Sequence, residues 1–467
     1  MSEPERPRAG GGRGAGRYCV IGAGAAGLAA LDALLDDGQA VECFEATDRV
    51  GGHWHTDYQS LHLITSRDLS GFVGHPMPAE YPVYPSRDEM RAYLEGFAVE
   101  RGLIEHIRFA TAVESLTPVD VGDGNSEVEP PGSGGWRVRT SGGVERTYDG
   151  VVVANGHLWD ARLPTFPGTF TGKVLHSADY HDVSDIDGRR VLVVGSGNSG
   201  CDIAVDAAMA RLDTTICVRR GHTFQPKAVF GRPRAELRWL AKLPLPIQEL
   251  VSRLLVDVVI GRPSRYRGLP DPETRNLNDQ PPVVNTLLPY WIQHGRIRVV
   301  PAIARFDGAT VHFVDGTSGE FDTVLLATGF NATFPFLDHS LLQWRDDVPL
   351  RVAAMTVPVG LERLYFVGLA APRGPQLPVY SHQARLVARF VRLVQDRSVG
   401  LAAHFADREP HDSRIDIVRK YWTAQLDRAN REVDRLGRGR RATPADVVPA
   451  DSIWQTPTGA AADDPTR

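Results

Sequence analysis

The chain is poor in cysteine. Only 4 of its 467 residues are cysteine, and no two of them are spaced as C-x-x-C. A closely spaced pair is typical of redox-active dithiols, so we do not expect a disulfide reductase. The cysteines fall in segments predicted as strands or helices, and we expect them to be buried and reduced. They are Cys19, Cys43, Cys201 and Cys217.

Long apolar runs and a large excess charge are also missing. No run approaches the roughly 20 apolar residues of a transmembrane helix. Residues 1–16 are rich in Arg and Gly and have no apolar centre, which is typical neither of a signal peptide nor of an anchor. The net charge of −5 gives no reason to expect a nucleic-acid partner. We therefore expect a globular, cytoplasmic protein without a transmembrane segment.

The chain does contain a glycine fingerprint near its start. The apolar run Tyr18–Ile21 leads into G-x-G-x-x-G and then into a predicted helix over Leu28–Leu35. The first glycine permits a tight turn, the second lets a pyrophosphate approach the backbone, and the third lets helix and strand pack closely. The helix N-terminus then favours the negative charge. We expect dinucleotide contacts from Gly22, Gly24, Ala25, Ala26 and Gly27.

A second predicted strand, Ala40–Phe44, ends in Glu45, about 20 residues after the fingerprint. That spacing is typical of the acidic residue that binds a ribose hydroxyl. Gly51-Gly52-His53-Trp54 follows, and a glycine pair with an aromatic residue here is similar to the FAD branch of this fold. We expect Gly52 and Trp54 to lie beside FAD, and we prefer a packing role to a proton-transfer role for His53.

The same pattern returns in the middle of the chain. Arg190–Val194 is a predicted strand, a second G-x-G-x-x-G follows, and a helix is predicted over Cys201–Ala210. The next strand, Thr214–Val218, is followed by two arginines instead of an acid. Guanidinium groups suit a ribose 2′-phosphate, which a carboxylate would repel, so we expect NADPH. The alternative is that these arginines are solvated strand-end charges. The expected NADPH residues here are Gly195, Ser196, Gly197, Asn198, Ser199, Gly200, Arg219 and Arg220.

Two further motifs accompany the fingerprints. Residues 170–180 match F-x-G-x-x-x-H-x-x-x-Y/F, and Ala327–Phe330 matches A-T-G-Y/F. With the fingerprints, in this order over Arg17–Gln395, the chain resembles the flavin-containing monooxygenases. The resemblance implies an NADPH contact at Thr328 and a hinge beside the NADPH site. The hinge residues would be Phe170, Gly172, His176 and Tyr180.

The resemblance implies an α/β fold with two Rossmann-like dinucleotide-binding domains, the NADPH domain being inserted into the FAD domain. The chain would cross between them at Asn155-Gly156 and Thr328-Gly329. Apolar residues at helical spacing predict an insertion over 232–280. We favour an ordinary helical insertion. The alternative is a lid or a surface that touches a membrane. The expected segments are a disordered arm (1–16), FAD domain (17–163), NADPH domain (164–326), FAD domain again (327–430) and a disordered tail (431–467).

The resemblance also implies an activity. In the family NADPH reduces FAD, oxygen adds at flavin C4a, and the hydroperoxide passes one oxygen atom to an amine nitrogen, as in N,N-dimethylaniline, or to a sulfide. A small nucleophile and O2 would be the partners, no metal ion is expected, and a homodimer is one allowed assembly. Related Baeyer–Villiger enzymes usually carry Trp where this chain has Tyr180, which favours heteroatom oxygenation.

One position departs from the family pattern. In the family an Asn in a stretch resembling S-N-x-S-K/R supports the oxygenated flavin, whereas here the aligned residue is Ile64. A hydrocarbon cannot form hydrogen bonds, so we expect neighbours such as Thr65, Ser66 or Asn331 to replace the amide or the function to be lost. Losing one preorganised donor costs on the order of 3 kcal/mol. Gln383 resembles a family position near the flavin, although a helix-capping Gln would look the same.

Three alternatives remain beside the monooxygenase. An NADPH oxidase that releases hydrogen peroxide follows if Ile64 leaves the hydroperoxide unprotected. Baeyer–Villiger oxygenation of a ketone is disfavoured by Tyr180 but stays open. A non-catalytic FAD-binding redox module belongs to a different class, and the intact second fingerprint argues against it because a sensor has no need of NADPH.

Overall fold

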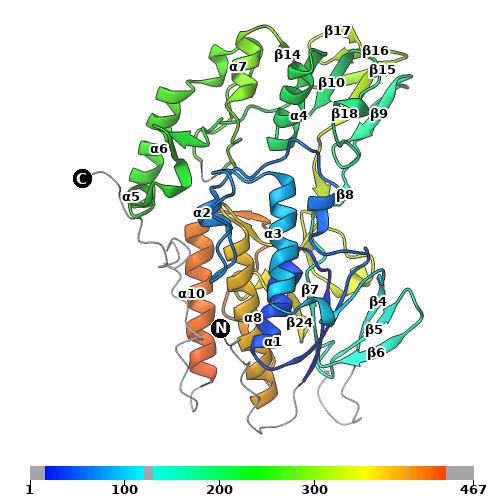
Figure 1. Cartoon of the computed structure of the whole chain (residues 1–467), viewed down its shortest axis with the longest axis vertical. Coiled ribbons are helices and arrows are strands. Elements are labelled where there is room, and N and C mark those ends of the chain that lie inside the picture. The colour runs from blue at the N-terminus through cyan, green and yellow to red at the C-terminus, as the bar shows by residue number, and fades with distance from the viewer. Residues whose placement is uncertain (1–15, 120–129, 278, 398, 438–467) are drawn as a thin grey trace.

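The structure is a computed structural model that describes residues 16–119, 130–277, 279–397 and 399–437. Two parallel five-stranded sheets are stacked along its long axis, the first in the lower half of Figure 1 and the second in the upper half. The fold is therefore α/β, with two Rossmann-like units. No helix among the described residues is long and apolar enough to cross a membrane.

The first sheet is apolar on both of its faces because both faces are covered. Alternate residues of its central strand enter different cores: Val20 packs with the helices and Cys19 packs with an antiparallel β-layer. The strand order is β24 (Leu364–Phe366), β7 (Gly150–Val153), β1 (Arg17–Ile21), β2 (Ala40–Phe44) and β3 (Ile107–Arg108). The covering elements are α1 (Ala25–Asp36), α3 (Arg87–Glu100) and α8 (Leu377–Arg397) on one face and β4 (Val113–Pro118), β5 (Trp136–Thr140) and β6 (Glu145–Tyr148) on the other.

The second sheet repeats this plan. Val193 packs against helices, whereas its neighbour Leu192 packs against a small antiparallel sheet. The strand order is β14 (Ile297–Val300), β11 (Asp213–Cys217), β10 (Arg190–Val194), β18 (Thr323–Leu326) and β9 (Lys173–His176). The covering elements are α4 (Asn198–Met209) and α7 (Leu287–Gln293) on one face and β15 (Ile303–Asp307), β16 (Thr310–Phe313) and β17 (Ser318–Glu320) on the other.

The two units are joined by two crossings that lie side by side. β8 (Asp160–Ala161) on the way out pairs antiparallel with β19 (Phe330–Asn331) on the way back. The chain leaves the first sheet after β7 and returns to it with β24, so the second unit is inserted into the first. Both predicted crossings lie close to this pair of strands.

The segment 67–106 carries α2 (Arg67–Ser70) and α3. A capping box begins α3: Ser86 N donates to Glu89 Oε2 at 2.7 Å, and Glu89 N donates to Ser86 Oγ at 3.3 Å. All four cysteines are buried and free, which confirms the prediction for these thiols.

The insertion begins at Ala228, earlier than the predicted residue 232, and contains a hairpin and two helices. The hairpin is β12 (Ala228–Val229) with β13 (Arg232–Pro233), and the helices are α5 (Arg238–Ala241) and α6 (Leu245–Val259). The C-terminal segment contains α9 (Leu401–Ala406), β26 (Asp416–Ile417) and α10 (Arg419–Leu436). In Figure 1 the insertion lies above α10 on the same side of the molecule.

Some predicted boundaries are wrong. The predicted tail from residue 431 begins too early, because α10 continues to Leu436 and buries Val433 against the core. The rest of that tail and residues 1–15 of the predicted arm lie outside the described residues. Helices α1 and α4 begin at Ala25 and Asn198, earlier than predicted, because the third glycine of each fingerprint is already helical.

Candidate functional site

The first and third glycines of each fingerprint are required by the protein itself. Gly22 and Gly195 have φ of +99° and +113°, in the left-handed region that favours glycine. A Cβ on Gly27 would lie 1.8 Å from the carbonyl oxygen of Gly22, and one on Gly200 would lie 2.1 Å from that of Gly195. The absence of a side chain at Gly27 and at Gly200 therefore allows each helix to approach the strand before it closely.

The second glycine of each fingerprint is different, because nothing in the protein crowds it. A Cβ on Gly24 would meet its nearest atom at 3.7 Å, and one on Gly197 would meet nothing within 4 Å. Both residues are the N-caps of their helices and share a φ of −71°. The free N–H groups of the first helical turn face this open space. We call the open space at Gly24 and the first turn of α1 the first cradle, and the corresponding space at Gly197 and α4 the second cradle. Each cradle fits a pyrophosphate.

Glu45 is placed at the edge of the first cradle. It is 7% exposed, its Oε2 accepts from Ala23 N at 2.7 Å, and its Oε1 accepts from Thr47 N at 2.8 Å. The carboxylate is thus fixed in orientation beside the turn where a ribose would lie. This geometry agrees with the ribose role expected for Glu45.

A cavity of about 1650 Å³ begins at the first cradle and reaches the insertion and the C-terminal segment. It brings together most of the residues predicted to bind FAD. From the second fingerprint only Asn198 lines it. The predicted site residues in its wall are Gly22, Gly24, Ala25, Ala26, Glu45, Gly52, Trp54, Ile64, Thr65 and Asn198.

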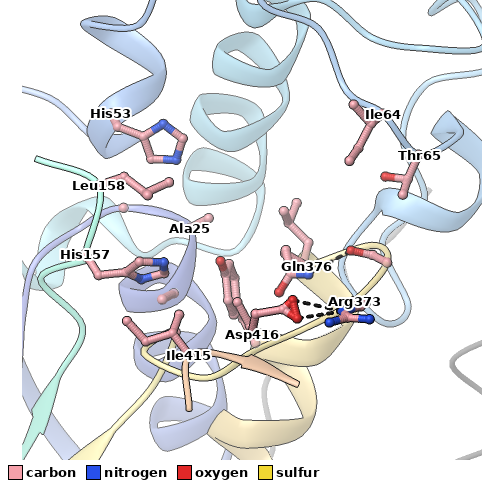
Figure 2. A pocket seen from close by; sticks show the side chains of 18 of the residues that line it. Ala25, His53, Ile64, Thr65, His157, Leu158, Arg373, Gln376, Ile415 and Asp416 are labelled. Carbon is pink, nitrogen blue, oxygen red and sulfur yellow. Dashed lines mark hydrogen bonds and ion pairs between the residues drawn. The ribbon is translucent and has the colours of Figure 1, made fainter. Parts of the chain in front are cut away.

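Ile64 lies in the wall of the cavity, as Figure 2 shows, with Thr65 beside it. Ile64 is 38% exposed, so its hydrocarbon side chain is accessible from the cavity. The hydroxyl of Thr65 is already hydrogen-bonded to Ser70 Oγ at 2.8 Å. Ser66 is buried behind the wall, and its Oγ has no hydrogen-bond partner among the described residues.

Several predicted residues do not line the cavity, among them Gln383, Asn331 and Thr328. Gln383 is 1% exposed, and its amide accepts from Gly368 N at 2.9 Å and donates to Ala370 O at 3.1 Å. Asn331 and Thr328 belong to the returning crossing. Asn331 Oδ1 accepts from Arg162 Nε at 3.1 Å, and Thr328 Oγ1 donates to Arg162 O at 2.6 Å. These side chains are bonded to neighbouring protein groups and do not line the cavity.

The predicted hinge residues join the second sheet to its surroundings. Tyr180 is fully buried and donates to Asp206 Oδ2 on α4 at 2.8 Å. The His176 ring meets the ring of Phe330 edge to face at 5.2 Å, next to the crossing. Phe170 bridges to Gly308, and a Cβ on Gly172 would lie 2.4 Å from Asp322 O. The positions of these four hinge residues indicate that they pack the second sheet against the crossing and the neighbouring elements.

The two arginines expected to select NADPH begin two residues after the last residue of β11, and both are exposed. Ser196 is buried and Ser199 is half-buried at the start of α4. Asn198, the first residue of α4, accepts at Oδ1 from Val284 N at 2.9 Å. The second cradle is thus tied to the loop that follows the insertion.

Several residues of the cavity wall carry no sequence motif. His157 follows β7, and burial lowers its pKa to about 4. Arg373 Nε donates to both oxygens of Asp416, at 2.6 and 2.9 Å, beside Gln376 (Figure 2). Lys227 and Arg234 come from the hairpin of the insertion. They have no fixed spacing from the fingerprints, so only tertiary packing could identify them.

Residues 15–399 match the protein family described as flavin-binding monooxygenase-like. Flavin-containing monooxygenase 5 of rabbit, Oryctolagus cuniculus, is 31% identical over 395 residues, which are 79% of this chain and 72% of the relative. An indole-3-pyruvate monooxygenase of rice, Oryza sativa subsp. japonica, is 32% identical over 370 residues, 75% of this chain and 85% of the relative.

Solved structures share the fold. A flavin-containing monooxygenase from Stenotrophomonas maltophilia superposes with a TM-score of 0.61 at 22% identity, covering 82% of this chain and 99% of its own. A cyclohexanone monooxygenase with bound ε-caprolactone gives a TM-score of 0.67 at 19% identity, covering 90% and 98%. The chain therefore belongs to the flavin-binding monooxygenase-like family and is a flavoprotein monooxygenase.

Proposed function

We propose that this protein is an NADPH-dependent FAD monooxygenase that transfers one oxygen atom from O2 to the nitrogen of an amine or the sulfur of a sulfide. The observation that carries the proposal is the pair of open cradles in one chain. The first is followed by an acid, Glu45, and the second by Arg219 and Arg220. An acid suits the ribose of FAD, and arginines suit the 2′-phosphate of NADPH.

The residues of the first cradle fit FAD. The N–H groups that follow Gly24 would hold the pyrophosphate, and Glu45 would hold the ribose. Trp54, Ile64 and Thr65 would surround the ring system, because they line the cavity that begins at this cradle. When bound, the flavin accepts a hydride from NADPH and activates O2. The chain's own part is to position both cofactors and to keep water away with an apolar wall.

Arg219 supplies the test of coenzyme choice. We expect NADPH to reduce the flavin at lower concentration than NADH does, and Arg219→Ala to raise the KM for NADPH about tenfold while leaving NADH nearly unchanged, since a charge-assisted contact is worth roughly 1.5–3 kcal/mol. Anaerobic reduction, followed as bleaching of the flavin, measures both coenzymes. Equal reduction by NADH and NADPH in the wild-type protein would contradict the role of the two arginines.

Oxygenation is tested separately by product analysis. With a sulfide as substrate, sulfoxide formed per NADPH consumed measures oxygen transfer, and hydrogen peroxide measures its failure. Ile64 favours a second candidate, an NADPH oxidase, because a hydrocarbon in the cavity wall cannot donate to an oxygenated cofactor. Peroxide equal to NADPH with every sulfide and amine tried would favour that oxidase.

A further inference from the structure

Two cations of the insertion face each other at the base of a tight hairpin. Ala228 pairs with Pro233, so Lys227 and Arg234 are the next opposite positions, and Arg234 N donates to Lys227 O at 2.9 Å. The turn at Phe230-Gly231 has φ of +51° and +76°, as in the turns that close two-residue hairpins. Both side chains are half-buried and line the cavity.

The partners of these cations are uncharged oxygens, a histidine ring and the ring of Tyr84, whose centroid lies 5.9 Å from Lys227 Nζ. Arg234 Nη1 donates to Gln225 Oε1 at 2.5 Å, and Nη2 donates to Ser252 Oγ at 3.4 Å. Lys227 Nζ contacts His62 Nε2. Among the described residues neither cation forms a salt bridge with a carboxylate. Burial lowers the pKa of both cations, a cost that a bound anion would relieve.

The nearby acids are engaged elsewhere. Asp202 is the carboxylate that acts on Lys227, but it accepts from Asn285 Nδ2 at 2.7 Å, and burial raises its pKa. Glu249 lines the cavity and lies 3.6 Å from Arg253 Nε. Asp416 is held by Arg373 on the first unit. None of these three carboxylates therefore forms an ion pair with Lys227 or Arg234, so both cations can pair with a bound anion.

The pair of cations lies next to the place expected for oxygen transfer. Lys227 contacts His62, which is two residues before Ile64 in the same segment. An anion held by Lys227 and Arg234 would consequently lie beside the part of the wall that carries Ile64. A guanidinium fork and an ammonium group together suit a carboxylate, which accepts hydrogen bonds through two oxygens.

We propose that Lys227 and Arg234 bind the carboxylate of the substrate, so that the oxygenated nucleophile belongs to a carboxylate-bearing class. This inference rests on the proposed oxygenase function. A phosphate of NADPH offers similar oxyanion chemistry, but Arg219 and Arg220 already follow the second cradle as candidates for its 2′-phosphate. The hairpin cations are therefore assigned to the substrate, and the experiment separates the two sources.

The holoenzyme is tested with 3-(benzylthio)propanoate and with its uncharged amide, and sulfoxide is measured. We expect kcat/KM for the acid to exceed that for the amide about tenfold, in line with one charge-assisted contact. Arg234→Gln should remove this preference through KM for the acid, whereas Arg234→Lys should retain part of it. The control is Arg232→Gln, an exposed cation of the same hairpin outside the cavity wall, which should keep the preference.

A binding measurement makes the inference independent of turnover. The carba analogue 5-phenylpentanoate should bind wild-type protein in calorimetry, and Arg234→Gln or Lys227→Met should weaken it about tenfold. If Arg234→Gln does not fold, Lys227→Met carries the test. If neither sulfide is oxygenated while the analogue still binds through these cations, the proposed function fails and the anion site stands.

Three results would overturn the inference. The amide could be oxygenated as well as the acid by the wild-type enzyme. The variants could reduce turnover of acid and amide equally. Arg234→Gln could raise the KM for NADPH with the acid preference intact, which would assign the cations to the coenzyme phosphate instead.

Discussion

At the scale of single residues, the part of the cavity wall that carries Ile64 presents a hydrocarbon where the family pattern has an amide. Ile64 presents carbon atoms to the cavity, and the hydroxyl of its neighbour Thr65 is engaged by Ser70. The unpartnered Ser66 hydroxyl points to no replacement, because it is buried behind the wall. Residues 64–66 themselves thus offer no free side-chain donor to the cavity.

Restoring an amide at residue 64 should improve coupling. We expect Ile64→Asn to lower the fraction of NADPH electrons that appear as hydrogen peroxide, by about tenfold or more, because one preorganised donor is worth roughly 3 kcal/mol. Peroxide and sulfoxide are quantified in the same reaction. Ile64→Leu, which adds no donor, is the control and should behave as wild type. An unchanged peroxide fraction in Ile64→Asn would mean that donors elsewhere already serve this purpose.

At the scale of secondary-structure elements, the strand–turn–helix unit separates structural glycines from a ligand-facing glycine. In α4 the space that a Cβ of Gly200 would need is taken by the carbonyl oxygen of Gly195, whereas the space beside Gly197 is open. The same distinction holds at Gly27 and Gly24 of α1. Two identical local geometries therefore occur in two sheets that share no strand.

This distinction predicts opposite effects for two alanine substitutions in α4. Gly197→Ala should leave the melting temperature nearly unchanged and raise the KM for NADPH, because its methyl group enters the space of the pyrophosphate. Gly200→Ala should lower the melting temperature or prevent folding, because its methyl group would lie 2.1 Å from a carbonyl oxygen. Thermal unfolding and NADPH titration measure both. A Gly197→Ala protein with normal NADPH affinity would remove this cradle from the coenzyme site.

At the scale of the whole molecule, hydrogen bonds tie the two units together. Ser60 Oγ in the first unit donates to Asp206 Oδ2 on α4 at 3.1 Å, and Tyr58 OH donates to Asp202 Oδ2 at 3.2 Å. Tyr180 donates to the same Asp206. The hinge motif and the segment before Ile64 thus meet on one helix face, which fixes the wall of the cavity relative to the second cradle.

The whole molecule should become less stable as the pH is lowered, over a range set by the pKa of a buried histidine. Burial, reinforced by Arg385 and Arg419, lowers the pKa of His382 from 6.5 to about 4. Between these values the unfolded chain binds a proton that the folded protein does not, so unfolding becomes easier as pH falls from about 6.5 towards 4. The effect of His382 reaches roughly 3 kcal/mol at the lower end.

Melting temperatures between pH 7 and pH 4.5 check this expectation. His382→Gln should show a smaller loss over that range than wild type, because it has no proton to take up on unfolding. The exposed His294 provides the control substitution, His294→Gln, which should keep the wild-type slope. A slope that His382→Gln leaves unchanged would assign the acid sensitivity to other groups.

Much of the fold could be read from the chain because its causes are local. The fingerprint spacing, the apolar strands and the capping box at Ser86 are each determined within a few residues by steric limits and hydrogen bonds. The duplicated unit and the family motifs predicted two Rossmann-like domains, one inserted into the other. The predicted helix starts lie too far along the chain because the third glycine of each fingerprint is already helical.

Tertiary structure alone decided which side chains share the cavity. Packing buried Ser66 and engaged Gln383 and Asn331 with other groups, although each was a reasonable candidate by chemistry. It also brought the hairpin of the insertion and the start of α10 to the same cavity wall. No periodicity or spacing encodes contacts between segments so far apart, because they depend on how complete layers pack against one another. The sequence by itself determined the two cradles, and only the folded chain decided what surrounds the space between them.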